Sequence, residues 1–342
     1  MKCIPSFMFV CIIMGATQGC ASLATRLPDV GSTALKFEQH RQETAAFAEV
    51  DQLYARLHHV TAPILAANTE LCPKTRYDIG VTTHKLKSYP KDMRVAAARE
   101  YGAKDTPSIR FVRPGSPSAM AGIERGDAIV GADERPLSAD DKGLQTLFED
   151  GGREISIRKK DGTLKGYTVK SREICGYNLN LKMSSVVNAY ATGKSISVTS
   201  GMMKFAKNDE ELALVIGHEL AHNTMNHVRK IVTNTIVSGM AKRYARPFES
   251  EADYVGLYYL VRAGYSAEDV EDMWRRMALT SPRHVARAKT HPTYPDRFLR
   301  IAAAREEIAA KQKQGKPLYP NFIDAKEFEK RVYTRAATDN AE

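Results

Sequence analysis

Residues 212–222 read Leu-Ala-Leu-Val-Ile-Gly-His-Glu-Leu-Ala-His, an apolar run that ends in the pattern His218-Glu219-x-x-His222. On a helix each residue turns the chain by about 100°, so the two histidines lie one turn apart on the same face. Both imidazoles can then bind one zinc ion, and Glu219 beside them can polarise a water molecule on that ion. The alternative is a buried helix whose histidines fit the pattern by chance.

The residues around this stretch favour a helix. Asn208 or Asp209 can cap its start, two glutamates follow that suit the positive end of its dipole, and no proline interrupts it. His227 lies nine residues beyond His218, which on a continuous helix is half a turn out of phase. We therefore expect that His227 does not bind the metal.

A second helix can supply the third metal ligand. Residues 247–256 read Pro-Phe-Glu-Ser-Glu-Ala-Asp-Tyr-Val-Gly, and Pro247 suits the first turn of a helix. Glu249 and Asp253 are four residues apart and face the same way, so Glu249 can complete the zinc site. Asp253 can accept a hydrogen bond from the far nitrogen of a ligand histidine. The alternative is a solvated helix face, which we expect for Glu251.

These motifs resemble the HtpX and CAAX prenyl endopeptidase family of zinc metallopeptidases, which also includes the Oma-like and BepA-like enzymes. Residues 188–201, Asn-Ala-Tyr-Ala-Thr-Gly-Lys-Ser-Ile-Ser-Val-Thr-Ser-Gly, resemble the strand before the family's motif helix, and residues 290–292, Thr-His-Pro, resemble its later segment. The resemblance covers about residues 176–312. It implies a mainly helical gluzincin-type domain with a small β-sheet and one zinc ion per chain, held by His218, His222 and Glu249.

The resemblance also implies roles for residues outside the two helices. Asn188, Ala189 and Tyr190 would lie along the cleft and pair with an extended substrate, although Tyr190 is as readily explained by packing. His291 would stabilise the developing oxyanion or coordinate zinc in a resting state, and we favour the resting state. Arg297 would assist by its charge. The alternative for His291 is a histidine in a surface loop.

Composition limits the class of protein. The 342 residues suffice for two domains, and 43% hydrophobic with 26% charged residues is typical of a soluble globular chain. The net charge is +10, but the basic residues are scattered and no nucleic-acid-binding motif occurs, so we expect no nucleic-acid partner. A solubilising surface, or attraction to an anionic membrane, explains the charge instead.

The N-terminus predicts export. Basic Met1-Lys2 precedes an apolar run at 7–14 that is too short to span a bilayer, so residues 1–20 are interpreted as a signal peptide. Gly19-Cys20 suggests a lipoprotein cleavage site with Cys20 acylated, although Thr17 stands where such sites usually have leucine. Ordinary cleavage nearby is the alternative. We expect a periplasmic protein with a lipid anchor that contacts the outer membrane.

Two cysteines remain in the mature chain, Cys72 and Cys175. An exported chain with two such cysteines is expected to pair them, and two free buried thiols are the alternative. The pair flanks a segment of different character.

The segment between the cysteines resembles a PDZ domain of the type found in periplasmic proteases. Glycine and proline mark turns in residues 112–130, and two strands surround a hairpin turn at Asp161-Gly162. Ile79, Gly80 and Val81 match the loop and strand with which PDZ domains bind peptide ends, so peptide ligands are expected. The alternative is a small β-rich domain without affinity for peptides.

Recurring apolar residues predict a helix over 33–70, with a kink or an end at Pro63. It packs against the protease body or, alternatively, binds a partner. Further helices are expected over 267–277, capped by Ser266 with Trp274 in the core, and over 296–312.

The fold class predicted is α+β. The expected organisation is a signal peptide (1–20), an N-terminal helical segment (21–75), a PDZ-like domain (76–173), a zinc metallopeptidase domain (174–312) and a polar tail (313–342). The favoured function is an exported zinc metalloendopeptidase, whose substrates by family resemblance are misfolded or misassembled envelope proteins. The alternative is an envelope chaperone or peptide-binding module in which proteolysis is minor or blocked.

Overall fold

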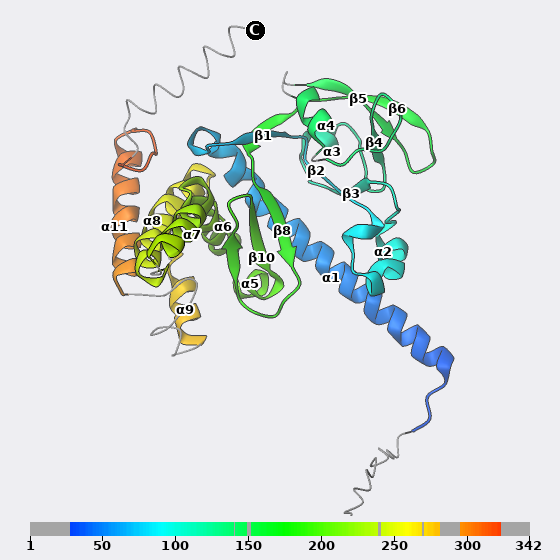
Figure 1. The fold of residues 1–342 in the computed structure, drawn as a ribbon, viewed down its shortest axis with the longest axis horizontal. Helices are drawn as coiled ribbons and strands as arrows, with labels where there is room; N and C mark the ends of the chain where they lie inside the picture. The colour runs from blue at the N-terminus through cyan, green and yellow to red at the C-terminus, as the bar shows by residue number, and fades with distance from the viewer. Residues whose placement is uncertain are drawn as a thin grey trace, which may run out of the picture. The chain divides into compact units, whose positions relative to one another are not determined.

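The computed structural model describes residues 28–139, 141–148, 152–238, 241–268, 270–280 and 295–322. The predicted signal peptide with Cys20, and His291, lie outside these residues. The chain forms two compact units, Met1–Gln42 and Glu43–Glu342, which are considered separately. Helices and several small sheets make up the fold, so the predicted α+β class is confirmed (Figure 1).

The first long helix, α1, spans Ser32–Ala67. In the first unit, Glu38 accepts hydrogen bonds from Arg41 and Gln42 along this helix. In the second unit, α1 buries apolar side chains that include Leu57, Val60 and Ile64. The expectation that Pro63 ends the helix is wrong: α1 continues past it, since the buried residues on either side offset the loss of one backbone hydrogen bond.

A disulfide joins the two ends of the segment that follows α1. Cys72 and Cys175 are bonded, with their Cα atoms 5.6 Å apart, as predicted. Next to them, β1 (Thr75–Asp78) pairs antiparallel with β7 (Arg172–Cys175). Closing a loop of 103 positions stabilises the folded chain by about 4–5 kcal/mol in the chain-entropy model.

Between these strands lie two small sheets with their own apolar cluster. β2 (Val81–His84) pairs with β3 (Ser108–Val112), and β4 (Ala128–Val130), β5 (Arg153–Arg158) and β6 (Leu164–Val169) form the second sheet in that order. Short helices connect them: η1 (Thr69–Leu71) before β1, then η2 (Leu86–Ser88), η3 (Lys91–Met93), α2 (Arg94–Tyr101), α3 (Pro117–Met120) and α4 (Lys142–Leu147). The predicted β5–β6 hairpin is present, with Gly162 at φ 90° in its turn. The domain boundaries stay a prediction.

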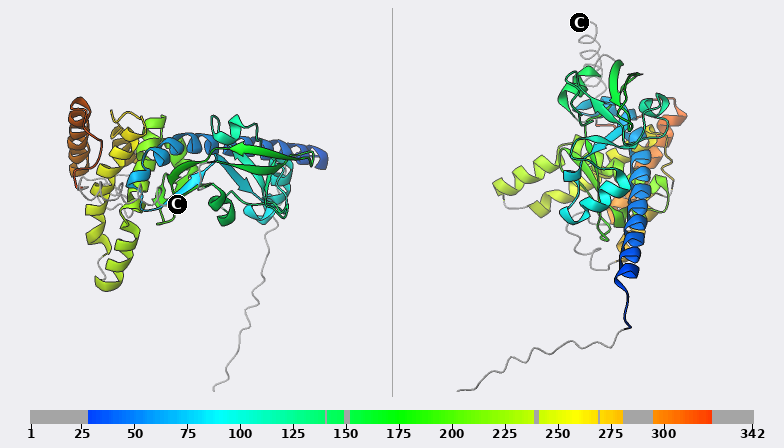
Figure 2. Two further views of the ribbon diagram at one scale, coloured as in Figure 1. Left: turned by 90° about the horizontal axis from the view of Figure 1, so that it is seen from above. Right: turned by 90° about the vertical axis from the view of Figure 1, so that its right-hand side faces the viewer.

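The remaining elements form a three-stranded sheet and a group of helices. The sheet has the order β8 (Asn178–Lys182), β10 (Ser195–Thr199), β9 (Ala189–Ala191), in which β8 is parallel and β9 antiparallel to β10. The helices are α5 (Ser200–Phe205), α6 (Asp209–Thr224), α7 (His227–Ser238), α8 (Ala241–Arg262), α9 (Asp272–Thr280) and α11 (Pro295–Lys313). Helix α8 contacts both α6 and α11 (Figures 1 and 2).

Helix α6 is fixed at its start by side chains from outside it. The Asn208 side chain accepts a hydrogen bond from the Glu211 backbone N–H at 2.9 Å, which confirms one of the two predicted caps. Arg56 on α1 donates to Asp209 at 2.9 Å and to three carbonyl oxygens just before α6, at 2.8, 3.0 and 2.6 Å. All residues from 211 to 224 are buried, so α6 is the central helix of this core.

Two glycines let α6 and α8 cross in backbone contact. A Cβ atom on Gly217 would lie 2.5 Å from the carbonyl oxygen of Gly256, and one on Gly256 would lie 2.7 Å from the backbone nitrogen of His218. No larger residue fits at either position without moving a helix. This close crossing brings the side chains of the two predicted site helices together.

Two predicted helix starts are wrong. Ser266 accepts a hydrogen bond from the Glu268 N–H, but α9 begins only at Asp272. Pro247 lies inside α8 rather than in its first turn, because the helix already begins at Ala241. Among the described residues, no helix combines the length and the apolar character needed to span a membrane.

Candidate metal centre

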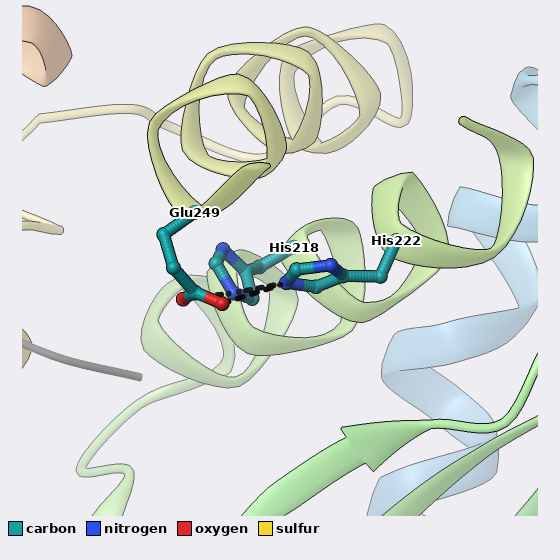
Figure 3. A group of neighbouring side chains, drawn as sticks. All are labelled: His218, His222 and Glu249. Carbon is teal, nitrogen blue, oxygen red and sulfur yellow. Dashed lines mark hydrogen bonds and ion pairs between the residues drawn. The ribbon is translucent and has the colours of Figure 1, made fainter. Parts of the chain in front are cut away.

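The two histidines of the motif and the predicted third ligand meet in one cluster. His218 and His222 extend from α6 and Glu249 from α8, and all three are buried (Figure 3). The two Nε2 atoms are 3.1 Å apart, and the Glu249 carboxylate oxygens lie 3.5 Å from Nε2 of His218 and 3.4 Å from Nε2 of His222. The cluster therefore has three converging ligand atoms.

The spacing of these atoms fits a tetrahedral zinc ion. Bonds of about 2.0–2.1 Å at tetrahedral angles place neighbouring ligand atoms about 3.3–3.4 Å apart. The two Nε2 atoms are 3.1 Å apart, and each lies 3.4–3.5 Å from one of the two Glu249 oxygens, Oε1 for His222 and Oε2 for His218, which is close to this value. Two imidazoles and one carboxylate are also a donor set that leaves the fourth position of catalytic zinc open.

The charges around His218 favour a cation. Burial alone would lower the pKa of His218, but hydrogen bonds to Asp253 and Glu249 outweigh it and raise the pKa to about 10. Carboxylates that stabilise a proton on this ring equally stabilise a metal ion in its place. Burial dominates at the neighbouring ligand and lowers the pKa of His222, which favours the neutral imidazole that binds metals.

Asp253 supports His218, as predicted, and is itself held by an arginine. Asp253 Oδ1 lies 2.9 Å from Nδ1 of His218, and the Arg297 guanidinium donates to both carboxylate oxygens at 2.5 and 2.6 Å. Burial would raise the pKa of Asp253, but the charge of Arg297 and the hydrogen bonds hold it below its usual value. Arg297 is 2% exposed and is placed to hold Asp253; whether it also acts by its charge stays a prediction.

Trp274 packs against His218 and Arg297. It is 4% exposed, which agrees with the predicted core position. Its ring lies 5.8 Å from the His218 ring and 5.4 Å from the Arg297 guanidinium, measured to the ring centroid. The only tryptophan therefore packs against a metal ligand and its support, a contact that the sequence did not indicate.

His227 and Glu251 form a second support that sequence reasoning missed. His227 Nδ1 lies 3.1 Å from Nδ1 of His222, and its Nε2 lies 2.7 Å from the Glu251 carboxylate. Hydrogen bonding to His227 lowers the pKa of Glu251 against the opposing effect of burial. The expectation of a fully solvated Glu251 is thus wrong, since its side chain is 33% exposed and bonded.

Sequence reasoning missed the contact between His227 and His222 because α6 ends before His227. The helix stops at Thr224, and Asn226 has a φ of 57°, so α7 starts in a new direction at His227. His227 is absent from the ligand cluster, as expected. The expectation that it faces away from His218 assumed, however, that one continuous helix carries both residues. A predicted helix end within residues 224–226 could have revealed that His227 turns back toward His222.

Among the described residues, Glu219 lies in α6, and the predicted substrate-binding residues lie in or next to β9, which contacts α6. Glu219 is 2% exposed within α6. Ala189 and Tyr190 belong to β9, an outer strand of its sheet, and Asn188 directly precedes them. Asn223 ties this sheet to α6: it accepts from the Gly193 N–H at 2.6 Å and donates to the Ser195 carbonyl at 3.1 Å.

Part of the predicted peptide-binding loop is buried in the apolar core of its segment. Ile79 and Val81 are 4% and 5% exposed and belong to the apolar cluster of the segment. Gly80 has a φ of 84°, and a Cβ there would lie 2.1 Å from Cβ of Ser116, so only glycine fits. Their role in binding peptides stays a prediction.

A helix that carries His-Glu-x-x-His, with a glutamate from a neighbouring helix, defines the ligand arrangement of a gluzincin-type metallopeptidase. Comparison with known families agrees. Residues 168–238 and 230–308 match the family model described as Peptidase family M48. This part of the chain, residues 168–308, is therefore similar to Peptidase family M48.

Three relatives are similar to part of the chain, and each is named mitochondrial metalloendopeptidase OMA1. The protein of Schizosaccharomyces pombe is 25% identical over 164 residues, which are 40% of this chain and 49% of the relative. The proteins of Arabidopsis thaliana and Saccharomyces cerevisiae are 28% and 26% identical, over 35% and 25% of this chain and 29% and 32% of their own. The chain thus spans about half the length or less of these relatives.

The relatives overturn the predicted location. All three are mitochondrial proteins, which contradicts a periplasmic protein anchored to the outer membrane of a bacterium. Charge and hydrophobicity at the N-terminus describe a leader-like segment but do not identify the membrane system that reads it.

One solved structure shows a partial likeness to the chain. It is the crystal structure of the HtrA3 PDZ domain bound to a phage-derived ligand, at 19% identity and a TM-score of 0.23, covering 30% of this chain and 93% of that one. A likeness at this level does not establish the fold, so the PDZ-like character stays a prediction.

Proposed function

We propose that the chain is a zinc-dependent metalloendopeptidase that hydrolyses peptide bonds in unfolded or misassembled proteins. The observation that carries the proposal is the buried set of His218, His222 and Glu249, whose ligand atoms lie within 4.8 Å of one another. The family match supports the reaction class. The envelope origin of the substrates depended on the periplasmic location, and it is not part of this proposal.

In this proposal Glu219 is the general base. When bound, zinc supplies Lewis acidity toward a peptide carbonyl and toward water. Glu219 takes the proton of the attacking water and returns it to the leaving amine. Its place between His218 and His222 in the motif, within the buried helix α6, supports this role.

The outer strand β9 supports binding of an extended substrate. Among the described residues β9 is the last strand of its sheet, next to β10, and an extended peptide can add to the edge of a sheet by main-chain hydrogen bonds. Tyr190 is 37% exposed on this strand, where it can contact a substrate side chain. Because Asn223 follows His222 directly and anchors the neighbouring turn, the strand keeps a fixed distance from the metal ligands.

The test compares Glu219→Gln with the parent on an unfolded protein such as casein. The variant keeps the three ligands, so we expect it to bind zinc as the parent does and to lose cleavage. A chelator should abolish cleavage by the parent, and added zinc should restore it. Glu210→Gln, at the start of the same helix, is the control and should cleave normally. Normal cleavage by Glu219→Gln contradicts the mechanism, and zinc binding without any cleavage by the parent favours the peptide-binding alternative.

Selection of substrates by the PDZ-like segment is the finer part of the proposal. It is supported by the tight turn at Gly80 beside β2, which matches the position of a peptide-binding loop. A peptide with an apolar C-terminus should slow cleavage of a large unfolded protein but not of a short peptide that reaches the metal centre unaided. Equal inhibition of both substrates, or of neither, contradicts selection by this segment.

A further inference from the structure

The geometry of the second support, His227 and Glu251, determines which ring nitrogen carries the proton in His222 and in His227. His222 points Nε2 toward the other ligand atoms, with Glu249 at 3.4 Å, and Nδ1 toward His227 at 3.1 Å. An imidazole that binds a metal through Nε2 carries its proton on Nδ1. That N–H must then donate to Nδ1 of His227, which leaves the His227 proton on Nε2, facing Glu251 at 2.7 Å.

The surroundings hold this chain of bonds in place. His227 is fully buried, and its ring stacks on Phe248 with centroids 4.7 Å apart and an interplanar angle of 23°. Phe248 and Glu251 both belong to α8, the helix that also supplies Glu249. Packing therefore fixes the plane of the His227 ring, and the carboxylate fixes which of its nitrogens carries the proton.

We propose that His227 and Glu251 form a positioning pair for His222, which holds this ring in the tautomer and orientation that leave Nε2 available to the metal. The inference rests on the proposed zinc centre and adds two residues that neither touch the metal nor belong to the motif. Hydrogen-bonded supports of this kind tune the basicity of a ligand, and their loss typically weakens metal binding by about 10–100-fold.

Two substitutions at one position separate hydrogen bonding from packing. His227→Phe keeps a ring that can stack on Phe248 but removes both hydrogen bonds. His227→Gln offers an amide oxygen toward His222 and an amide N–H toward Glu251. We expect zinc affinity, measured by competition with a chromophoric chelator, to fall by about 10–100-fold in the phenylalanine variant and to recover largely in the glutamine variant.

Two control variants, a measurement of stability and an NMR measurement separate the effect on zinc binding from other effects of the substitutions. His59→Phe and Glu306→Gln replace exposed residues of the same kinds and should leave zinc affinity unchanged. Unfolding by urea with a chelator present measures stability apart from metal binding. On the zinc-loaded parent, ¹⁵N NMR of the imidazoles should find the proton of His222 on Nδ1 and that of His227 on Nε2, which needs no variant to fold.

The outcomes distinguish the inference from the proposed function. A parent chain that binds no zinc contradicts the metallopeptidase proposal itself. A parent that binds zinc, with a His227→Phe variant that binds it equally well, contradicts only the positioning pair. The reverse tautomer at His227 contradicts it too, as does a glutamine variant that binds zinc no better than the phenylalanine variant.

Discussion

The two histidine ligands of the centre are supported in different ways. His218 bonds directly to Asp253, a carboxylate that is 1% exposed and held by Arg297 through two hydrogen bonds. At His222 the ring nitrogen that faces away from Glu249 bonds to His227, which in turn bonds to the carboxylate of Glu251, and the Glu251 side chain is 33% exposed. The first support is a closed ion pair in the core, and the second extends from the core to the edge of the protein.

Because of this difference, we expect one support to contribute mainly to the stability of the fold and the other mainly to metal affinity. A buried ion pair costs much free energy to break from one side, because the remaining charge is left without its partner. Removing the charge of a carboxylate that water can reach changes the free energy of unfolding little, because water already screens that charge. We therefore expect changes in the Asp253 support to unfold the protein, and changes in the Glu251 support to alter metal affinity with little effect on folding.

The largest expected effect follows Asp253→Asn. The substitution keeps the shape of the side chain but removes the carboxylate that is nearest to Arg297. Because Glu249 also lies 3.7 Å from Arg297, the free energy of unfolding should fall by about 3 kcal/mol, the lower end of the loss for a broken buried pair. Urea unfolding in the presence of a chelator measures this without a contribution from the metal. Asp272→Asn, whose side chain is 56% exposed, is the matched control. A loss below about 1 kcal/mol would show that the two supports do not differ as described.

A smaller effect is expected for Arg297→Lys. An ammonium group keeps the charge but cannot donate to both oxygens of Asp253 in the planar geometry of a guanidinium, so the loss should be about 1–3 kcal/mol. Arg275→Lys, on an exposed ion pair with Asp272, should change the free energy of unfolding by much less. Combining Asp253→Asn with Arg297→Met should cost less than the sum of the two single changes. Additive losses would contradict the pairing.

The smallest effect is expected for Glu251→Gln. The amide still accepts a hydrogen bond from His227, so the free energy of unfolding should fall by about 1 kcal/mol or less. Because this carboxylate is partly exposed, the difference between parent and variant should shrink as salt rises from about 0.1 M to about 1 M, where the screening length falls from about 10 Å to about 3 Å. The loss caused by Asp253→Asn should change far less over the same range. Equal salt dependence of the two variants would remove the distinction.

Local periodicity made much of this centre predictable. His218 and His222 lie one helical turn apart, and so do Glu249 and Asp253, so each pair could be placed on one face before the helices were placed in space. The cap at Asn208 and the strand at 195–199 were predictable for the same reason, since each depends on neighbouring residues. The disulfide was predictable because only two of the five cysteines, Cys72 and Cys175, follow residue 20.

The missed features depend on contacts between segments far apart in the sequence. Nothing near Arg297 indicates that it lies against Asp253, 44 positions earlier. The role of His227 required knowing that α6 ends at Thr224, and helix ends are set by packing as much as by local preference. The close crossing of Gly217 and Gly256 likewise appears only when both helices are in place.

The linked cysteines have a consequence for how such a chain can change in evolution. Although 103 positions separate Cys72 and Cys175, their Cα atoms are 5.6 Å apart, a distance that one or two residues can span. The intervening segment therefore enters and leaves the peptidase core at one point, as a cassette does. A change in the length of this segment therefore need not move the helices that carry His218 and Glu249. The same geometry suggests to protein engineers a site at which another domain could be inserted.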